Sequence, residues 1–145
     1  MHTTNLSAPP AGLPRIVPHL IYDDVAAAVE WLSRTFDFAE RTFARHTLPD
    51  GTLGRTQLQV GDSVITVGPP SIHADSPRRG VSSMLYVYVD DVDEHYRRAT
   101  AAGATIVAPL EDRPWGDRSY QATDPERHQW TFAQHLGRDS PWEHA

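Results

Sequence analysis

The sequence predicts an α+β fold built from two βαβββ modules, and three observations support this prediction. The phrase Tyr22-Asp23-Asp24-Val25 returns as Val89-Asp90-Asp91-Val92, about half of the 145-residue chain further on. Each copy follows a short apolar run and precedes a stretch with helical spacing of apolar residues. Turn signals then divide the rest of each half into short β-type segments. An internal repeat of this kind indicates one supersecondary unit used twice.

The first module is expected at residues 15–68, after a flexible leader at residues 1–14. Asp23-Asp24 suits a helix N-cap, and the helical spacing that starts at Val25 is expected to end near Phe36 or Asp37. Pro49-Asp50-Gly51 predicts a turn, and Gly61-Asp62 predicts a two-residue hairpin loop. The predicted strands are residues 15–22, 38–48, 52–60 and 63–68.

The second module is expected at residues 81–136, after a linker at residues 69–80 and before a polar tail at residues 137–145. Asp90 or Asp91 is the expected cap of a helix that runs through Ala102, and Gly103 suits its C-terminal end. The predicted strands are residues 81–89, 104–110, 117–123 and 128–134. The element order is therefore βαβββ again.

Composition narrows the classes of partner. The chain has 13 Lys and Arg against 19 Asp and Glu, and this net charge of −6 argues against a nucleic-acid partner held by phosphate contacts. It has no cysteine, so disulfides, thiolate metal sites and cysteine nucleophiles are excluded. No run approaches the roughly 20 apolar residues of a membrane helix, and the start lacks the features of a signal peptide. We therefore expect a cytoplasmic protein with neither a nucleic acid nor a membrane as its partner.

Several short motifs occur in a recognisable order. These are the two Asp-Asp-Val phrases, Val17-Pro18-His19-Leu20-Ile21, Ala102-Gly103-Ala104, Trp115-Gly116-Asp117-Arg118, Asp124-Pro125 and His128-Gln129-Trp130. Together with the two modules, residues 15–136 resemble the glyoxalase/bleomycin-resistance group of the vicinal oxygen chelate superfamily. The resemblance implies paired, cupped, mixed sheets around a small-molecule cavity, with the helices outside, and a homodimer that often completes the cavity. Members range from metal-dependent enzymes to metal-free drug-sequestering proteins, so function must be argued from the site.

The resemblance also allows a test for a metal site. In metal-dependent relatives the ligands come from the first and last strand of each module, and the register places them here at Val17, Thr66, Met84 and Thr131. A thioether and two hydroxyls do not suit a divalent ion that prefers carboxylate or imidazole donors. His19 faces the same side as Val17 and would enter if the register shifted by two residues, but as a lone ligand. We expect no metal and no other cofactor.

Strand alternation then assigns residues to the cavity. The candidates for ligand contact combine aromatic rings with neutral amides and hydroxyls, which is typical of a site for a planar organic molecule. Trp130 and Phe132 fall on the opposite face, as core. The candidate ligand-binding residues are His19, Gln57, Gln59, Thr66, Tyr86, Tyr88, Trp115, Tyr120 and Thr131.

Each candidate has a structural alternative. Tyr86 and Tyr88 are also suited to filling the mouth of a sheet, and Trp115 is as well suited to packing on a sheet edge as to closing over a ligand. His19 is the best single candidate for a catalytic base, although a lone histidine is more often a satisfied polar residue. Asp117 with Arg118 is interpreted as a structural ion pair.

Three hypotheses of function follow. The favoured one is a metal-free binding protein that sequesters a small hydrophobic, aromatic or cationic molecule, with an antibiotic as one possibility. The alternative is a glyoxalase-like lyase or isomerase, either metal-independent, with His19 as base and Tyr86 or Tyr120 as proton donor, or metal-dependent through ligands not identified here. The third is an interaction module whose cavity is filled by its own side chains.

Overall fold

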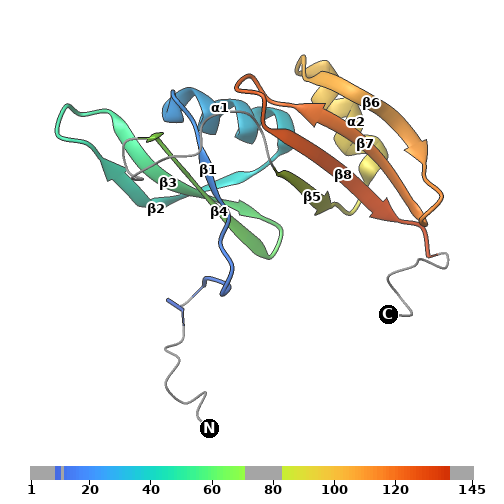
Figure 1. The fold of residues 1–145 in the computed structure, drawn as a ribbon, viewed down its shortest axis with the longest axis horizontal. Coiled ribbons are helices and arrows are strands. Elements are labelled where there is room, and N and C mark those ends of the chain that lie inside the picture. The colour runs from blue at the N-terminus through green and yellow to red at the C-terminus, as the bar shows by residue number, and fades with distance from the viewer. Residues whose placement is uncertain (1–8, 11, 71–82, 138–145) are drawn as a thin grey trace, which may run out of the picture. The chain divides into compact units, whose positions relative to one another are not determined.

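The computed structural model describes residues 9, 10, 12–70 and 83–137 (Figure 1). Within these residues lie two helices and two four-stranded mixed sheets, which confirms the predicted α+β fold of two βαβββ modules. The predicted linker and tail lie almost entirely outside the described residues. The elements are β1 (His19–Ile21), α1 (Val25–Phe36), β2 (Ala39–Thr47), β3 (Leu53–Val60), β4 (Ser63–Gly68), β5 (Met84–Tyr88), α2 (Val92–Ala101), β6 (Thr105–Asp112), β7 (Asp117–Thr123) and β8 (Gln129–His135).

The two sheets repeat one topology. Their strand orders are β1-β4-β3-β2 and β5-β8-β7-β6, with the first strand of each module parallel to the last and the other pairs antiparallel. The repeat extends to single residues, because His19 stands opposite Thr66 in the first sheet and Tyr86 stands opposite Thr131 in the second. The repeated phrase in the sequence therefore marks equivalent positions in the two modules.

Equivalent aspartates begin the two helices. An Asp24 side-chain oxygen accepts the backbone N–H of Ala27 at 3.0 Å, and Asp91 accepts that of Glu94 at 3.1 Å. Each carboxylate satisfies one of the N–H groups that the first turn of a helix leaves unpaired. Gly103 follows α2 with φ of +88°, a conformation that glycine adopts at little cost.

The chain divides into two compact units, each described here by itself. Among the described residues, the first unit holds β1 to β4 and the start of α1 as far as Val29. The second holds β5 to β8, α2 and the residues Glu30–Asp37 at the end of α1. No helix in the described part of the chain is long and apolar enough to cross a membrane.

In the second unit, one face of the sheet is the core. Trp130 and Phe132 on β8 are fully buried, and the Phe36 ring lies 4.6 Å from that of Phe132 and 5.7 Å from that of Trp130, centroid to centroid. Helix α2 packs on the same sheet, against β6, β7 and β8. Aromatic pairs at these distances stabilise the core by more than the burial of their surface alone.

A neutral histidine joins the helices to this core. His95 Nε2 lies 3.0 Å from the carbonyl oxygen of Phe36, and Nδ1 lies 2.6 Å from the Tyr120 hydroxyl. Because a carbonyl only accepts, Nε2 carries the hydrogen and Nδ1 accepts from Tyr120. Burial lowers the pKa of His95 and raises that of Tyr120, so both groups stay uncharged at neutral pH.

The turn before β8 contains a strained residue. Arg127 has φ of +72°, a left-handed conformation that is costly for a side chain with a Cβ. Asp124 holds this turn, because its carboxylate accepts the backbone N–H groups of Glu126 and His128 at 3.0 Å and the indole N–H of Trp130 at 3.2 Å. The hydrogen bonds to Asp124 therefore offset the strain at Arg127.

Replacing Arg127 with glycine is expected to stabilise the protein by about 1 kcal/mol, because it removes the left-handed strain. Urea unfolding measures this change. Glu126→Gly is the matched control, because Glu126 lies in the same turn without a positive φ and should gain nothing. An Arg127→Gly variant no more stable than the wild type would show that the turn carries no strain.

Candidate functional site

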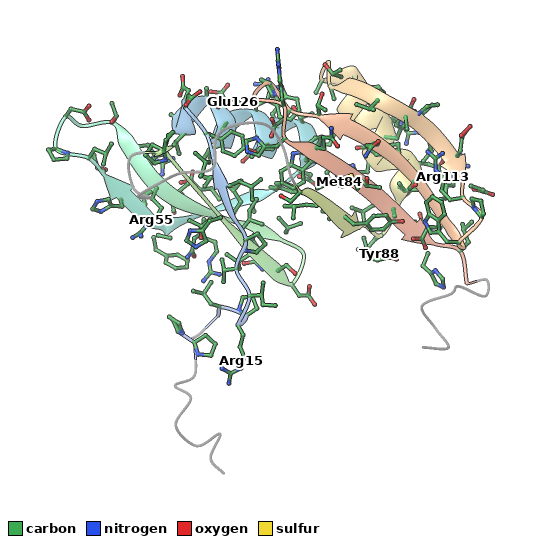
Figure 2. The ribbon with its side chains drawn as sticks, in the orientation of Figure 1. Arg15, Arg55, Met84, Tyr88, Arg113 and Glu126 are labelled. Carbon is green, nitrogen blue, oxygen red and sulfur yellow. The ribbon has the colours of Figure 1, made fainter. Side chains whose placement is uncertain are left out.

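The face of the second sheet opposite Trp130 and Phe132 is called the open face here. Cross-strand pairing puts β5 residues 84, 86 and 88 beside β8 residues 129, 131 and 133, which in turn lie beside β7 residues 123, 121 and 119. Met84, Tyr86 and Tyr88 remain 43%, 40% and 56% exposed on it. Figure 2 labels Met84 and Tyr88 on β5. Three large apolar side chains are thus presented together on one strand.

A buried carboxylate anchors the two tyrosines. Asp117, the first residue of β7, is only 2% exposed and pairs with His135 across the strands. Its Oδ2 accepts the hydroxyl of Tyr86 at 2.5 Å and that of Tyr88 at 3.0 Å, and its Oδ1 accepts His135 Nδ1 at 3.1 Å. The Trp115 indole N–H donates to the Tyr86 oxygen at 3.2 Å. These five residues are called the Asp117 cluster below.

The hydrogen bonds fix the charge of the cluster. Burial by itself raises the pKa of Asp117, but the bonds from Tyr86, His135 and Tyr88 outweigh burial and leave the pKa below its usual value. Burial and the neighbouring carboxylate raise the pKa of Tyr86 to about 12 and also raise that of Tyr88. At neutral pH the phenols therefore keep their protons and the negative charge stays on Asp117.

The interpretation of Asp117 and Arg118 as an ion pair is wrong. Successive residues of a strand face opposite sides, so Arg118 points away from the open face. Its guanidinium binds Asp93 of α2 at 3.0 Å and Asp112 of β6 at 3.1 Å. Asp117 therefore faces the open face and is not paired with Arg118.

The expectation that Tyr120 faces the cavity is also wrong. Tyr120 pairs with Phe132 and Ala122 pairs with Trp130, so both lie on the helix side, and both are fully buried. Gln121 occupies the open face instead, opposite Thr131. The prediction assigned the even-numbered residues of β7 to the open face. The odd-numbered residues Asp117, Ser119 and Gln121, which are polar, lie there instead.

Of the four positions at which the family resemblance places metal ligands, residues 84 and 131 contact each other. Met84 Sδ accepts the Gln121 amide at 2.7 Å and the Thr131 hydroxyl at 3.2 Å, while Val17 and Thr66 occupy the equivalent positions of the first module. This donor set of a thioether and neutral groups does not fit a hard or borderline divalent ion. In the part of the chain that the structure describes, no three His, Asp or Glu side chains are grouped so as to hold a metal.

The remaining candidates lie in the first unit. His19 is exposed and stands opposite Thr66, which in turn stands opposite Gln57, so these three form one row across the sheet. Thr66 itself is buried. Gln59 donates its side-chain amide to the carbonyl oxygen of Gly61 at 2.8 Å, a bond within its own hairpin.

The structure thus brings together Tyr86, Tyr88 and Trp115, with Thr131 on the same face of the sheet. Sequence reasoning missed Asp117 and His135, which hold the tyrosines in place. Odd-numbered residues of β7 and β8 share a face of the sheet, but this follows only once residue 117 is known to lie opposite residue 135.

Comparison with known proteins assigns the family. Residues 12–132 match the family profile described as the Glyoxalase/Bleomycin resistance protein/Dioxygenase superfamily. The chain belongs to this superfamily. The solved structure of TioX from Micromonospora sp. ML1 is similar with a TM-score of 0.71 and 38% identity, covering 85% of this chain and 99% of TioX.

Two further proteins are similar to this chain. The uncharacterized protein Mb0911c of Mycobacterium bovis is 34% identical over 129 residues, which is 83% of each chain. FosX, a fosfomycin resistance protein from Listeria monocytogenes, has a TM-score of 0.62 at 18% identity, covering 83% of this chain and 92% of FosX. At that identity the likeness to FosX concerns the fold alone.

Asp117→Asn is expected to destabilise this superfamily member by about 2 kcal/mol at neutral pH, because the variant replaces a hydrogen-bonded buried charge. The folded-state pKa of Asp117 lies below the unfolded-state value, so the contribution is present above about pH 4 and is lost as the pH falls further. Urea unfolding of both proteins at neutral pH and in acid checks this.

Asp90→Asn is the matched control, because Asp90 is exposed and the same substitution there should cost little at any pH. A difference between wild type and Asp117→Asn that stays constant into strong acid would contradict the assigned ionisation.

Proposed function

We propose that this chain is a metal-independent small-molecule-binding protein whose site is the open face of the second sheet with the Asp117 cluster. The ligand is a hydrophobic, aromatic or cationic organic molecule, an antibiotic being one class that fits. The observation that carries the proposal is the pair of exposed tyrosine rings whose hydroxyls are fixed to a buried carboxylate.

This arrangement suits binding because it is ordered beforehand. Tyr86 and Tyr88 have ring centroids 5.4 Å apart with an interplanar angle of 59°, and each hydroxyl has a defined acceptor. A ligand that stacks on them does not have to immobilise free side chains, which is a main cost of association. Met84 and Gln121 extend the same face with a thioether and an amide.

Family membership by itself supports both binding and catalysis, since the family description combines a resistance protein with two classes of enzyme. The choice for binding rests on the donor set at residues 17, 66, 84 and 131 and on the aromatic surface. A homodimer, as the family resemblance implies, belongs to the proposal and is tested by sedimentation equilibrium. A cytoplasmic location belongs to it as well.

One observation favours a second candidate function, a glyoxalase-like lyase or isomerase. His135 is exposed and donates through Nδ1 to the buried Asp117, an arrangement that orients an imidazole for general-base work. This makes His135 a better candidate base than His19. Turnover lost in His135→Gln but retained in His19→Ala would move the enzyme ahead of the binding protein.

Tyr88→Ala and Trp115→Ala are each expected to weaken the binding of a planar aromatic compound by roughly fivefold, because each removes a stacking surface worth about 1 kcal/mol. A thermal-shift screen with soluble planar dyes identifies the compound, and titration of tryptophan fluorescence measures the affinity of the Tyr88 variant. Calorimetry serves for the Trp115 variant, which lacks a reporter.

Phe43→Ala is the control, because Phe43 is an aromatic ring of the first unit that is 80% exposed and outside the Asp117 cluster. Equal weakening by Phe43→Ala, or no dye that raises the melting temperature, would count against the proposed site.

A further inference from the structure

We propose that the ligand of this site carries a positive charge, as a quaternary ammonium or an N-alkylated aromatic ring, and is held on the exposed ring faces of Tyr86 and Tyr88. This inference rests on the proposed function, because it concerns the same site and specifies the chemistry of its ligand.

The exposed surface of the two tyrosines belongs to their rings. Both hydroxyls point to Asp117, which is 2% exposed, whereas the side chains as a whole are 40% and 56% exposed. The polar ends are therefore bound to Asp117, and exposed surface remains on the rest of the two residues. The negative face of an aromatic ring attracts a cation within about 6 Å of its centre.

The buried carboxylate strengthens this attraction. A phenol that donates to a carboxylate gains electron density on its oxygen and ring, and Oδ2 of Asp117 accepts both phenols at 2.5 and 3.0 Å. The Asp117 carboxylate also attracts a cation directly, and its burial reduces the screening of this attraction by water. Rings and carboxylate thus favour the same sign of ligand charge.

The nearby arginine does not cancel the charge of Asp117. Among the described residues, the ion-pair partner of Asp117 is His135, which is charged only when protonated. Arg113 reaches the same region through Ser119, but its guanidinium binds Glu111 at 3.1 Å and the carbonyl oxygens of Pro109 and Ser119. With His135 neutral, Asp117, Arg113 and Glu111 leave one net negative charge.

An anionic ligand would meet this charge and be repelled, and a neutral planar ligand would stack without electrostatic gain. For cations, each ring contributes an attraction that ranges from weak at exposed sites to strong when desolvated. Two rings and a carboxylate together predict roughly tenfold tighter binding of a cation than of a neutral compound of the same shape.

The test compares two planar probes of similar size, the cation 1-methylquinolinium and the neutral 4-methylquinoline, at neutral pH. Calorimetry with the full chain gives both affinities, and their ratio is the measurement. We expect a ratio of roughly ten in the wild type and a clearly smaller ratio in Asp117→Asn, in which only the rings still favour the cation. Asp90→Asn, an exposed aspartate outside the cluster, should keep the wild-type ratio.

A second variant keeps the test decisive if Asp117→Asn fails to fold. Tyr86→Phe with Tyr88→Phe retains both rings but removes the bonds that feed electron density into them, so the ratio should fall. Equal affinities for the two probes in the wild type would overturn the inference and leave the proposed binding site standing. Binding of neither probe would also overturn it, and the proposed function would fall too if the wider dye screen found nothing.

Discussion

The carboxylate of Asp117 is the constraint on which the open face depends. Burying an ionised group is costly unless donors replace its water, and here two phenols and an imidazole do so. The donors come from β5 and β8, and Asp117 itself begins β7, so one charge ties three adjacent strands together on one side. The tyrosines cannot turn their hydroxyls outward without leaving that charge unsatisfied.

The two faces of the second sheet differ in whether their aromatic rings are buried or exposed. On the helix side, a neutral His95 accepts from Tyr120 and donates to the carbonyl oxygen of Phe36, and the Tyr120 and Phe132 rings near it are buried. On the open side, the charge of Asp117 is retained and aromatic surface is left exposed above it. A protein that only needed stability would be better served by apolar packing on both faces. The asymmetry is what favours a ligand for the open face.

Much of the fold could be predicted because the sequence contains an internal repeat of one module. The equivalent caps Asp24 and Asp91 and the alternation within each strand led to the right elements and placed Tyr86 and Tyr88 on the open face. The phase of one strand against another could not be predicted, because the turn at residues 124–128 sets it through contacts that have no simple pattern. For this reason Tyr120 was predicted on the wrong face, and Asp117 was not predicted as a site residue.

The ionisation of Asp117 is the central claim, and carboxyl carbon NMR tests it most directly. In protein labelled at aspartate carboxyl carbons, with Asp117→Asn assigning the signal, the resonance is followed as the pH is lowered. The account predicts that Asp117 titrates below the usual aspartate value near 3.8. A titration at or above that value would show that burial prevails over the hydrogen bonds, and would contradict the account of Asp117 as a carboxylate stabilised by its three donors.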